Sequence, residues 1–139
     1  MSELGLTSSS PPSRPFNPQD FLSLAKSLMN YDTPHSQGIR RIVLGRAYYA
    51  AFLDAREKVR RKYPKQLAGH AGKIRVHQHV RDLLKELKAA NISDKLHALF
   101  EYREKADYDL HSIIDVTDME SSVLLSENII QLVRDLKIS

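Results

Sequence analysis

The sequence of 139 residues contains no cysteine and only five glycines. Without cysteine the chain forms neither disulfides nor thiolate metal sites, which fits a reducing cytoplasm. No apolar run approaches the roughly 20 residues that span a bilayer. No apolar segment of the kind found in secretory signals follows the N-terminus. We therefore expect a cytoplasmic protein without a membrane partner.

Motifs that would announce a cofactor or a metal are also missing. The sequence has no glycine-rich phosphate loop and no HExxH spacing. Its six histidines do not pair with carboxylates at the spacing of metal ligands. We therefore expect neither a metal site nor a cofactor.

The composition is that of one globular domain with a disordered tail. The hydrophobic fraction of 42% and the charged fraction of 27% are ordinary for a soluble protein. The segment Met1–Phe16 is rich in serine and proline and cannot bury apolar area, which predicts disorder. The remainder, 17–139, is long enough to bury a core and is assigned to a single helical bundle.

Helical punctuation and periodicity predict an all-α, up-down bundle of four to five helices. Asn17 and Pro18 have the residue types of a helix N-cap and first turn. Pro64 ends the second helix and opens a loop to Gly72. Thr117 and Glu120 have the spacing of a capping box for the last helix. The expected helices start at Asn17, span Ser36–Tyr63 and Ile74–Ala89, run from Asn91 or Ser93 to His111–Ile114, and start again at Thr117.

Two of these helices carry charges inside an apolar stripe. Arg103 and Asp107 recur at helical spacing with Leu96, Leu99 and Leu110. An unpaired buried charge costs roughly 3–5 kcal/mol, so these charges need a partner or a function. Either they form a salt bridge four residues apart that locks the bundle, or they line a polar pocket at a dimer cleft.

The helix Ile39–Val59 shows the same anomaly at Arg46, and its middle is apolar nearly all round, which indicates a central helix. We expect Arg46 to pair with Asp107 or Asp54 across helices, or to belong to a site. Aromatic and imidazole groups complete the predicted polar cluster, as core groups with satisfied hydroxyls or as surfaces for base stacking. The cluster comprises Arg46, Tyr49, Asp54, His77 and Tyr108.

Positive charge is concentrated in one stretch. Between Arg56 and Arg81 there are nine lysines or arginines and a single acid, Glu57. Such a stretch is either a solvated helix end or an attractor for a phosphate backbone. The candidate RNA- or phosphate-binding residues are Arg56, Arg60, Arg61, Lys62, Lys65, Lys73 and Arg75.

Three segments taken in order resemble one family. They are Arg46–Phe52 (RAYYAAF), His77–Val80 (HQHV) and Arg103–Tyr108 (REKADY). Together they are similar to the higher eukaryote and prokaryote nucleotide-binding (HEPN) domain family, in its small stand-alone prokaryotic branch, over about Phe16 to Leu136. The resemblance implies a four- to five-helix bundle that commonly dimerises and acts on RNA, often in toxin–antitoxin or defence systems. It also implies, for some members, a nucleotidyltransferase-like antitoxin partner.

Ribonucleases of that family carry an arginine followed by a histidine after four to six residues, whereas seven residues separate Arg103 from His111 here. On a continuing helix, Arg103, Asp107 and His111 would still lie on one side. Imidazole supplies a base near neutral pH and guanidinium a permanent cation, as metal-independent RNA cleavage requires. These three are the candidate catalytic residues. The alternative is a noncatalytic module that binds a nucleotide or a protein, with the charges as structural groups.

Overall fold

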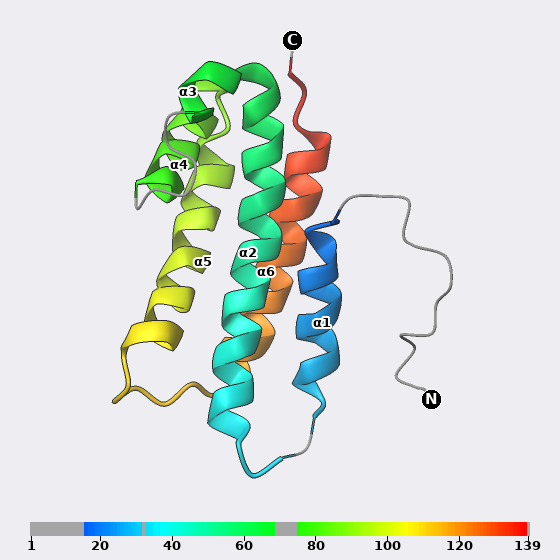
Figure 1. Cartoon of the computed structure of the whole chain (residues 1–139), viewed down its shortest axis with the longest axis vertical. Helices are drawn as coiled ribbons and strands as arrows, with labels where there is room; N and C mark the ends of the chain where they lie inside the picture. Colours follow the sequence, from blue (N-terminus) through cyan, green and yellow to red (C-terminus); the bar gives the residue numbers. More distant parts are fainter. Residues whose placement is uncertain (1–15, 32, 69–74, 139) are drawn as a thin grey trace, which may run out of the picture.

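The computed structural model describes residues 16–31, 33–68 and 75–138 of the chain. Within these ranges every regular element is a helix, and together the helices form an all-α bundle (Figure 1). The helices are α1 (Gln19–Met29), α2 (Ser36–Lys62), α3 (Pro64–Ala68), α4 (Val76–Glu86), α5 (Ala90–Tyr108) and α6 (Val116–Asp135). The fold class predicted from the sequence is therefore confirmed. The predicted disordered tail falls on residues outside the described ranges, except for Phe16.

Helix α2 is the centre of the bundle, as its sequence predicts. It packs against α1, α4, α5 and α6, and small alanines let its neighbours approach closely (Figure 1). The core divides into two clusters of buried residues. One joins α2 to α4, α5 and α6, and the other joins α2 to α1 and the start of α6. The fully buried residues of α2 include Val43, Leu44, Ala47, Tyr48, Ala50, Ala51, Ala55 and Val59.

The ends of the first and last helices depend on polar caps. The Asn17 side-chain oxygen accepts a hydrogen bond from the Gln19 backbone N–H at 3.0 Å, in agreement with its predicted capping role. At α6 the predicted capping box is wrong by two residues. Asp115 accepts from the Asp118 N–H at 2.7 Å, and the Asp118 carboxylate accepts from the Asp115 N–H at 3.2 Å. Aspartates perform the reciprocal capping that the sequence analysis assigned to Thr117 and Glu120.

Two further boundaries differ from the predictions. Helix α5 ends at Tyr108, several residues before the expected end at 111–114. The Arg41 guanidinium explains this end, because it donates hydrogen bonds to the carbonyl oxygens of Ala106 (2.8 Å) and Ser112 (2.6 Å). It thereby satisfies free carbonyls at the helix terminus and holds the following turn. The short α3 lies in the expected loop after Pro64, which takes the first helical position.

No helix among residues 16–31, 33–68 and 75–138 has both the length and the apolar character that crossing a membrane requires.

Candidate functional site

An aromatic cluster joins α2, α4 and α5 around His77. The ring of His77 lies 4.4 Å from that of Phe52 and 5.5 Å from those of Tyr48 and Phe100, centroid to centroid. The fully buried Tyr48 places its hydroxyl oxygen 2.6 Å from His77 Nδ1. His77 therefore makes contacts that join α2, α4 and α5, in keeping with its predicted place in a cluster.

The protonation of this pair follows from its surroundings. Burial, together with the nearby Arg103 and Arg81 guanidiniums, lowers the pKa of His77 to about 4, so the ring is neutral at pH 7. Burial also raises the pKa of Tyr48 well above its usual value, which keeps the phenol protonated. A buried phenol donates best to the Nδ1 lone pair, which assigns the His77 proton to Nε2. The half-buried His77 ring then presents a neutral N–H donor.

Arg103 leans across the aromatic cluster from α5. Its guanidinium carbon lies 5.4 Å from the Tyr49 ring centroid, 5.8 Å from that of Phe100 and 5.9 Å from that of Tyr48. Its Nε donates to the Asp107 carboxylate at 2.9 Å, which is the predicted salt bridge four residues apart. The Arg103 side chain is 13% exposed and that of Asp107 is 39% exposed, so the pair lies at the rim of the bundle.

Arg46 also lies close to Tyr49. Its guanidinium carbon stands 4.6 Å from the Phe21 ring centroid and 5.8 Å from that of Tyr49. Among the described residues it forms no ion pair, so the expected pairing with Asp107 or Asp54 does not occur. Stacking on rings satisfies this half-buried cation in place of a carboxylate. Tyr49 consequently lies close to two guanidiniums, one from its own helix and one from α5.

Two residues of the predicted cluster lie elsewhere. Asp54 is half-buried between α2 and α6, near Arg134, Lys58 and Arg61. Tyr108, the last residue of α5, is 69% exposed and makes no ring contact with the described residues. The sequence predicts Tyr108 as a core residue or a stacking surface of the cluster, whereas its side chain lies in solvent at the end of α5.

His111 is also displaced from its predicted position. It lies beyond the end of α5, in an exposed turn where its backbone N–H donates to the Asp109 carboxylate at 3.2 Å. The helical alignment of Arg103, Asp107 and His111 is therefore wrong. Around this turn several large apolar side chains face solvent, namely Tyr108, Leu110, Ile113 and Val116.

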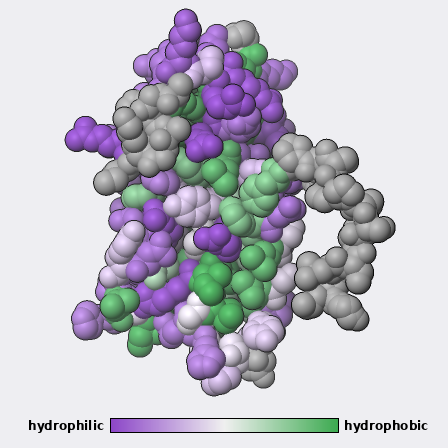
Figure 2. All heavy atoms as spheres, in the orientation of Figure 1, coloured by the Kyte–Doolittle hydropathy of each residue, from purple (hydrophilic) through white to green (hydrophobic). Residues whose placement is uncertain are grey.

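The basic stretch forms the end of the bundle that carries α3, where hydrophilic residues gather in the upper part of Figure 2. Its cations are not equivalent. The Arg60 guanidinium donates to both carboxylate oxygens of Glu57, at 2.9 and 2.5 Å, and is already occupied. The predicted contact Lys73 lies outside the described residues. The other predicted contacts are Arg56 and Arg61 at half-buried and exposed positions of α2, Lys65 in α3, Arg75 just before α4, and Lys62 at the end of α2, which like Arg60 has a partner.

The structure adds residues that the sequence analysis did not assign to the site. Arg81 lies one turn after His77, its guanidinium carbon 5.2 Å from the Phe100 ring, and its Nη1 is buried without a hydrogen-bond partner in the described structure. Helical spacing could have indicated both Arg81 and Phe100 as members of this cluster. Arg81 stands four residues after His77, and Phe100 stands three residues before Arg103, so each shares a helix face with a predicted residue. No local signal indicates Phe21, because its approach to Arg46 depends on how α1 packs.

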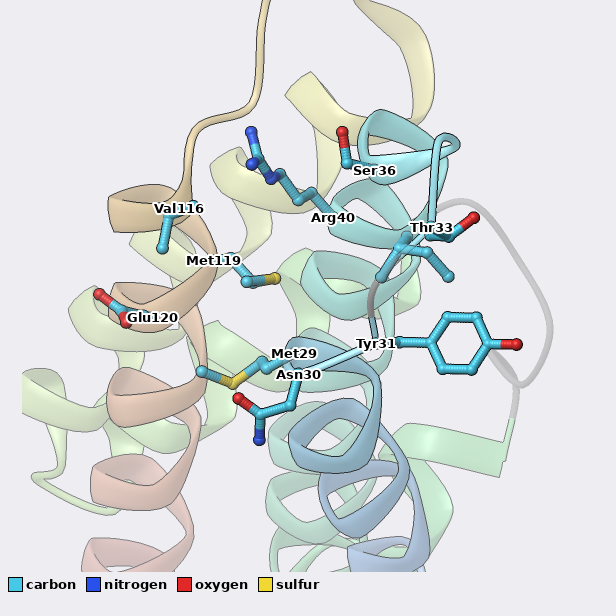
Figure 3. A pocket seen from close by; sticks show the side chains of 10 residues that line it. Met29, Asn30, Tyr31, Thr33, Ser36, Arg40, Val116, Met119 and Glu120 are labelled. Carbon is cyan, nitrogen blue, oxygen red and sulfur yellow. The ribbon is translucent and has the colours of Figure 1, made fainter.

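A separate cavity of about 310 Å³ lies at the opposite end of the bundle, where α1 ends and α2 and α6 begin (Figure 3). Met29 and Met119 form an apolar part of its wall, and Arg40 and Glu120 supply opposite charges. One Arg40 nitrogen already donates to the Ile114 carbonyl at 3.0 Å. None of the predicted site residues lines this cavity, so it is distinct from the Tyr49 region.

Within the part of the chain that the structure describes, no group of three or more histidine, aspartate or glutamate side chains is arranged to hold a metal ion. Comparisons with protein-family models, with curated proteins and with solved structures found no match to this chain.

Proposed function

We propose that this chain is a HEPN-like RNA-binding protein whose contact surface is centred on Tyr49. The observation that carries the proposal is the closeness of the Tyr49 ring to two guanidiniums, 5.8 Å from Arg46 and 5.4 Å from Arg103. Single-stranded RNA is held by aromatic rings that stack on bases and by cations that bind phosphates. A half-buried tyrosine close to two arginines offers both kinds of contact on one surface.

Charge and hydrogen bonding extend this surface. Arg46 has no carboxylate partner among the described residues, so its fork of donors is available to a phosphate. Arg103 donates from Nε to Asp107 and places Nη1 3.6 Å from the Glu104 carboxylate, while its guanidinium carbon lies 5.4 Å from the Tyr49 ring centroid. The neutral His77 contributes an N–H donor without adding charge. The basic end of the bundle supplies the long-range attraction that brings a polyanion to this face.

The direct test is a titration of fluorescent single-stranded RNA against the purified protein at several salt concentrations. Because each phosphate contact releases counterions, we expect binding to weaken steeply with salt, with a slope of about −0.7 per contact. Absence of salt-sensitive binding by the wild-type protein would remove the RNA proposal. It would favour the noncatalytic alternative, in which Arg46, Arg103 and Asp107 support a nucleotide- or protein-binding module.

Ribonuclease activity is a second candidate that requires two subunits. In one protomer His111 lies in the turn after α5, while Arg103 lies within that helix and is engaged with Asp107. Exposed apolar side chains next to His111, among them Leu110 and Ile113, favour a homodimer in which the turn of one subunit meets its partner. Light scattering on the wild type and on Leu110→Ser with Ile113→Ser tests the dimer.

The catalytic part of this candidate has its own experiment. A cleavage time course without metal compares the wild type with His111→Ala and Arg103→Ala. Loss of turnover with binding retained supports catalysis, because such residues act on the transition state. Binding without cleavage by the wild type, in the presence of a demonstrated dimer, rejects it. Co-purification with the product of an adjacent nucleotidyltransferase-like gene would separately test the antitoxin partner.

A further inference from the structure

A groove of about 230 Å³ runs between α2 and α6 at the basic end of the bundle. Figure 1 shows α1 beside the lower half of these two helices, and both helices continue beyond the N-terminal end of α1. The groove lies on this continuation, because its residues come from the second half of α2 and the last turns of α6. It is lined by Asp54, Glu57, Lys58, Arg61, Val133 and Arg134.

Cations approach this groove from both helices. Lys58 and Arg61 come from α2 and Arg134 from α6, and the Lys58 ammonium donates to the Arg134 backbone carbonyl at 3.4 Å. The guanidiniums of Arg61 and Arg134 form no hydrogen bond or ion pair with any described residue. The neighbouring Arg60 differs, because Glu57 occupies its guanidinium. Two arginine forks are therefore available inside one groove.

The groove contains a single carboxylate that is not already held. Asp54 is half-buried, and none of the three cations comes within ion-pair distance of it in the described structure. Burial raises its pKa, while the fields of Arg134, Lys58 and Arg61 act in the opposite direction. Since Glu57 is held by Arg60, three cations face one carboxylate, and the groove keeps an excess of positive charge.

We propose that this groove is a phosphate-binding subsite for the same RNA strand that contacts Tyr49. The forked guanidinium of an arginine can donate two hydrogen bonds to the oxygens of one phosphate. A phosphate in the groove could therefore accept from Arg61 on α2 and from Arg134 on α6. This inference rests on the proposed RNA-binding function, and it adds Lys58 and Arg134 to the contacts. Neither residue was among the phosphate contacts chosen from the sequence.

The geometry of α2 connects the groove to Tyr49. At about 100° and 1.5 Å per residue, Arg46 and Arg61 lie about 22 Å apart along the axis of α2 and about 60° apart around it. Tyr49 lies on the other flank of Arg46, about 120° around the axis from Arg61. One extended strand that runs from Tyr49 past Arg46 to the groove can therefore contact both places, whereas a mononucleotide occupies only one.

The test is a salt titration of fluorescent oligouridylate binding by the full chain, with variants in matched pairs. Arg134→Ala is compared with Lys137→Ala, which removes the same charge just beyond α6, and Arg61→Ala is compared with Arg60→Ala. We expect Arg134→Ala and Arg61→Ala to weaken binding several-fold and to reduce the salt slope by about 0.7 each. The two controls should change binding much less. Asp54→Asn should strengthen binding, since it removes a negative charge from the subsite.

Equal, small effects for both members of each pair, together with unchanged binding by Asp54→Asn, would overturn the subsite. The proposed function would still stand if Tyr49→Leu weakened binding in the same series. Wild-type protein that does not bind oligouridylate at all would instead overturn the proposed function, and the subsite with it. Asp54→Asn keeps the test decisive if an arginine variant fails to fold, because its expected effect is a gain. Competition by inorganic phosphate at millimolar concentration should affect the wild type more than Arg134→Ala.

Discussion

The hydroxyl oxygen of Tyr48 lies 2.6 Å from Nδ1 of His77, and this contact joins the central helix α2 to the first turn of α4. In the chain, residues 63–75, which include α3, separate these two helices. A hydrogen bond between a buried phenol and a neutral imidazole fixes how they meet. Its energetic value depends on His77 staying unprotonated.

Acid should therefore destabilise the protein through His77. The pKa of this residue is about 4 in the folded protein, because of burial and then of Arg103 and Arg81, and its ordinary value is 6.5. Between these two values the unfolded chain binds a proton that the folded protein does not. The stability that the neutral ring provides is complete above pH 6.5 and is lost progressively as the pH falls toward 4.

Urea unfolding of the wild type and of His77→Gln at pH 7 and pH 5 checks this. We expect the wild type to lose more stability than the variant between the two pH values, since the variant lacks the titrating group. Carboxylates that titrate in the same range affect both proteins alike and cancel in the comparison. Parallel losses in the two proteins would contradict the assignment of the acid effect to His77.

Arg103 should contribute more to the stability of the fold than its partner Asp107. Arg103→Ala removes a mostly buried side chain from three aromatic rings, and we expect a destabilisation of about 1–2 kcal/mol. Asp107→Ala should cost less than about 0.5 kcal/mol, because its carboxylate is partly solvated and surface ion pairs contribute little. The loss expected for Arg103→Ala is smaller than for a fully buried ion pair, because there the carboxylate left without its partner would add a further destabilisation. Denaturant unfolding of the two single variants measures both values, and similar losses would show that the salt bridge, not ring stacking, holds Arg103.

The turn after α5 should depend on Arg41. Its guanidinium donates to the carbonyl oxygens of Ala106, Asp109 and Ser112, at 2.8, 3.1 and 2.6 Å. Arg41→Lys retains the charge but cannot reach several carbonyls at once, so we expect a loss of about 2 kcal/mol and faster hydrogen exchange in residues 106–114. Arg75→Lys, at an exposed position outside these contacts, is the matched control. Unchanged exchange in that turn would refute the capping role.

The fold was predictable because its signals are local. The apolar surround of α2 and the cap at Asn17 depend on residues close together in the chain, and both led to correct helices. The end of α5 depends on Arg41, more than sixty residues earlier, and no nearby residue announces it. That error placed His111 on a helix that ends before it, at Tyr108.

The sequence indicated which residues belong to the candidate site better than it indicated which of them contact each other. Arg46 and Arg103 were identified because charges interrupt an apolar stripe, and Asp107 was correctly placed one turn after Arg103. Arg46 was assigned a carboxylate, because sequence spacing cannot show that α1 brings Phe21 under its guanidinium. Asp54 was assigned to the same cluster because it lies near the apolar stripe of α2 in the sequence. In the structure it lies beside residues of α6 instead.

The last prediction separates stacking from packing at Tyr49. Tyr49→Phe keeps a ring close to Arg46 and Arg103, whereas Tyr49→Leu keeps apolar volume and removes the ring. If bases stack on this side chain, we expect Tyr49→Leu to weaken RNA binding by about 1–3 kcal/mol and Tyr49→Phe to weaken it far less. Both variants should leave the salt slope unchanged, because stacking releases no counterions. Fluorescence titration at two salt concentrations measures both quantities, with circular dichroism to confirm that each variant is folded. Equal losses in the two variants would assign the effect to the hydroxyl, and no loss in either would move the RNA contact away from Tyr49 to the cations alone.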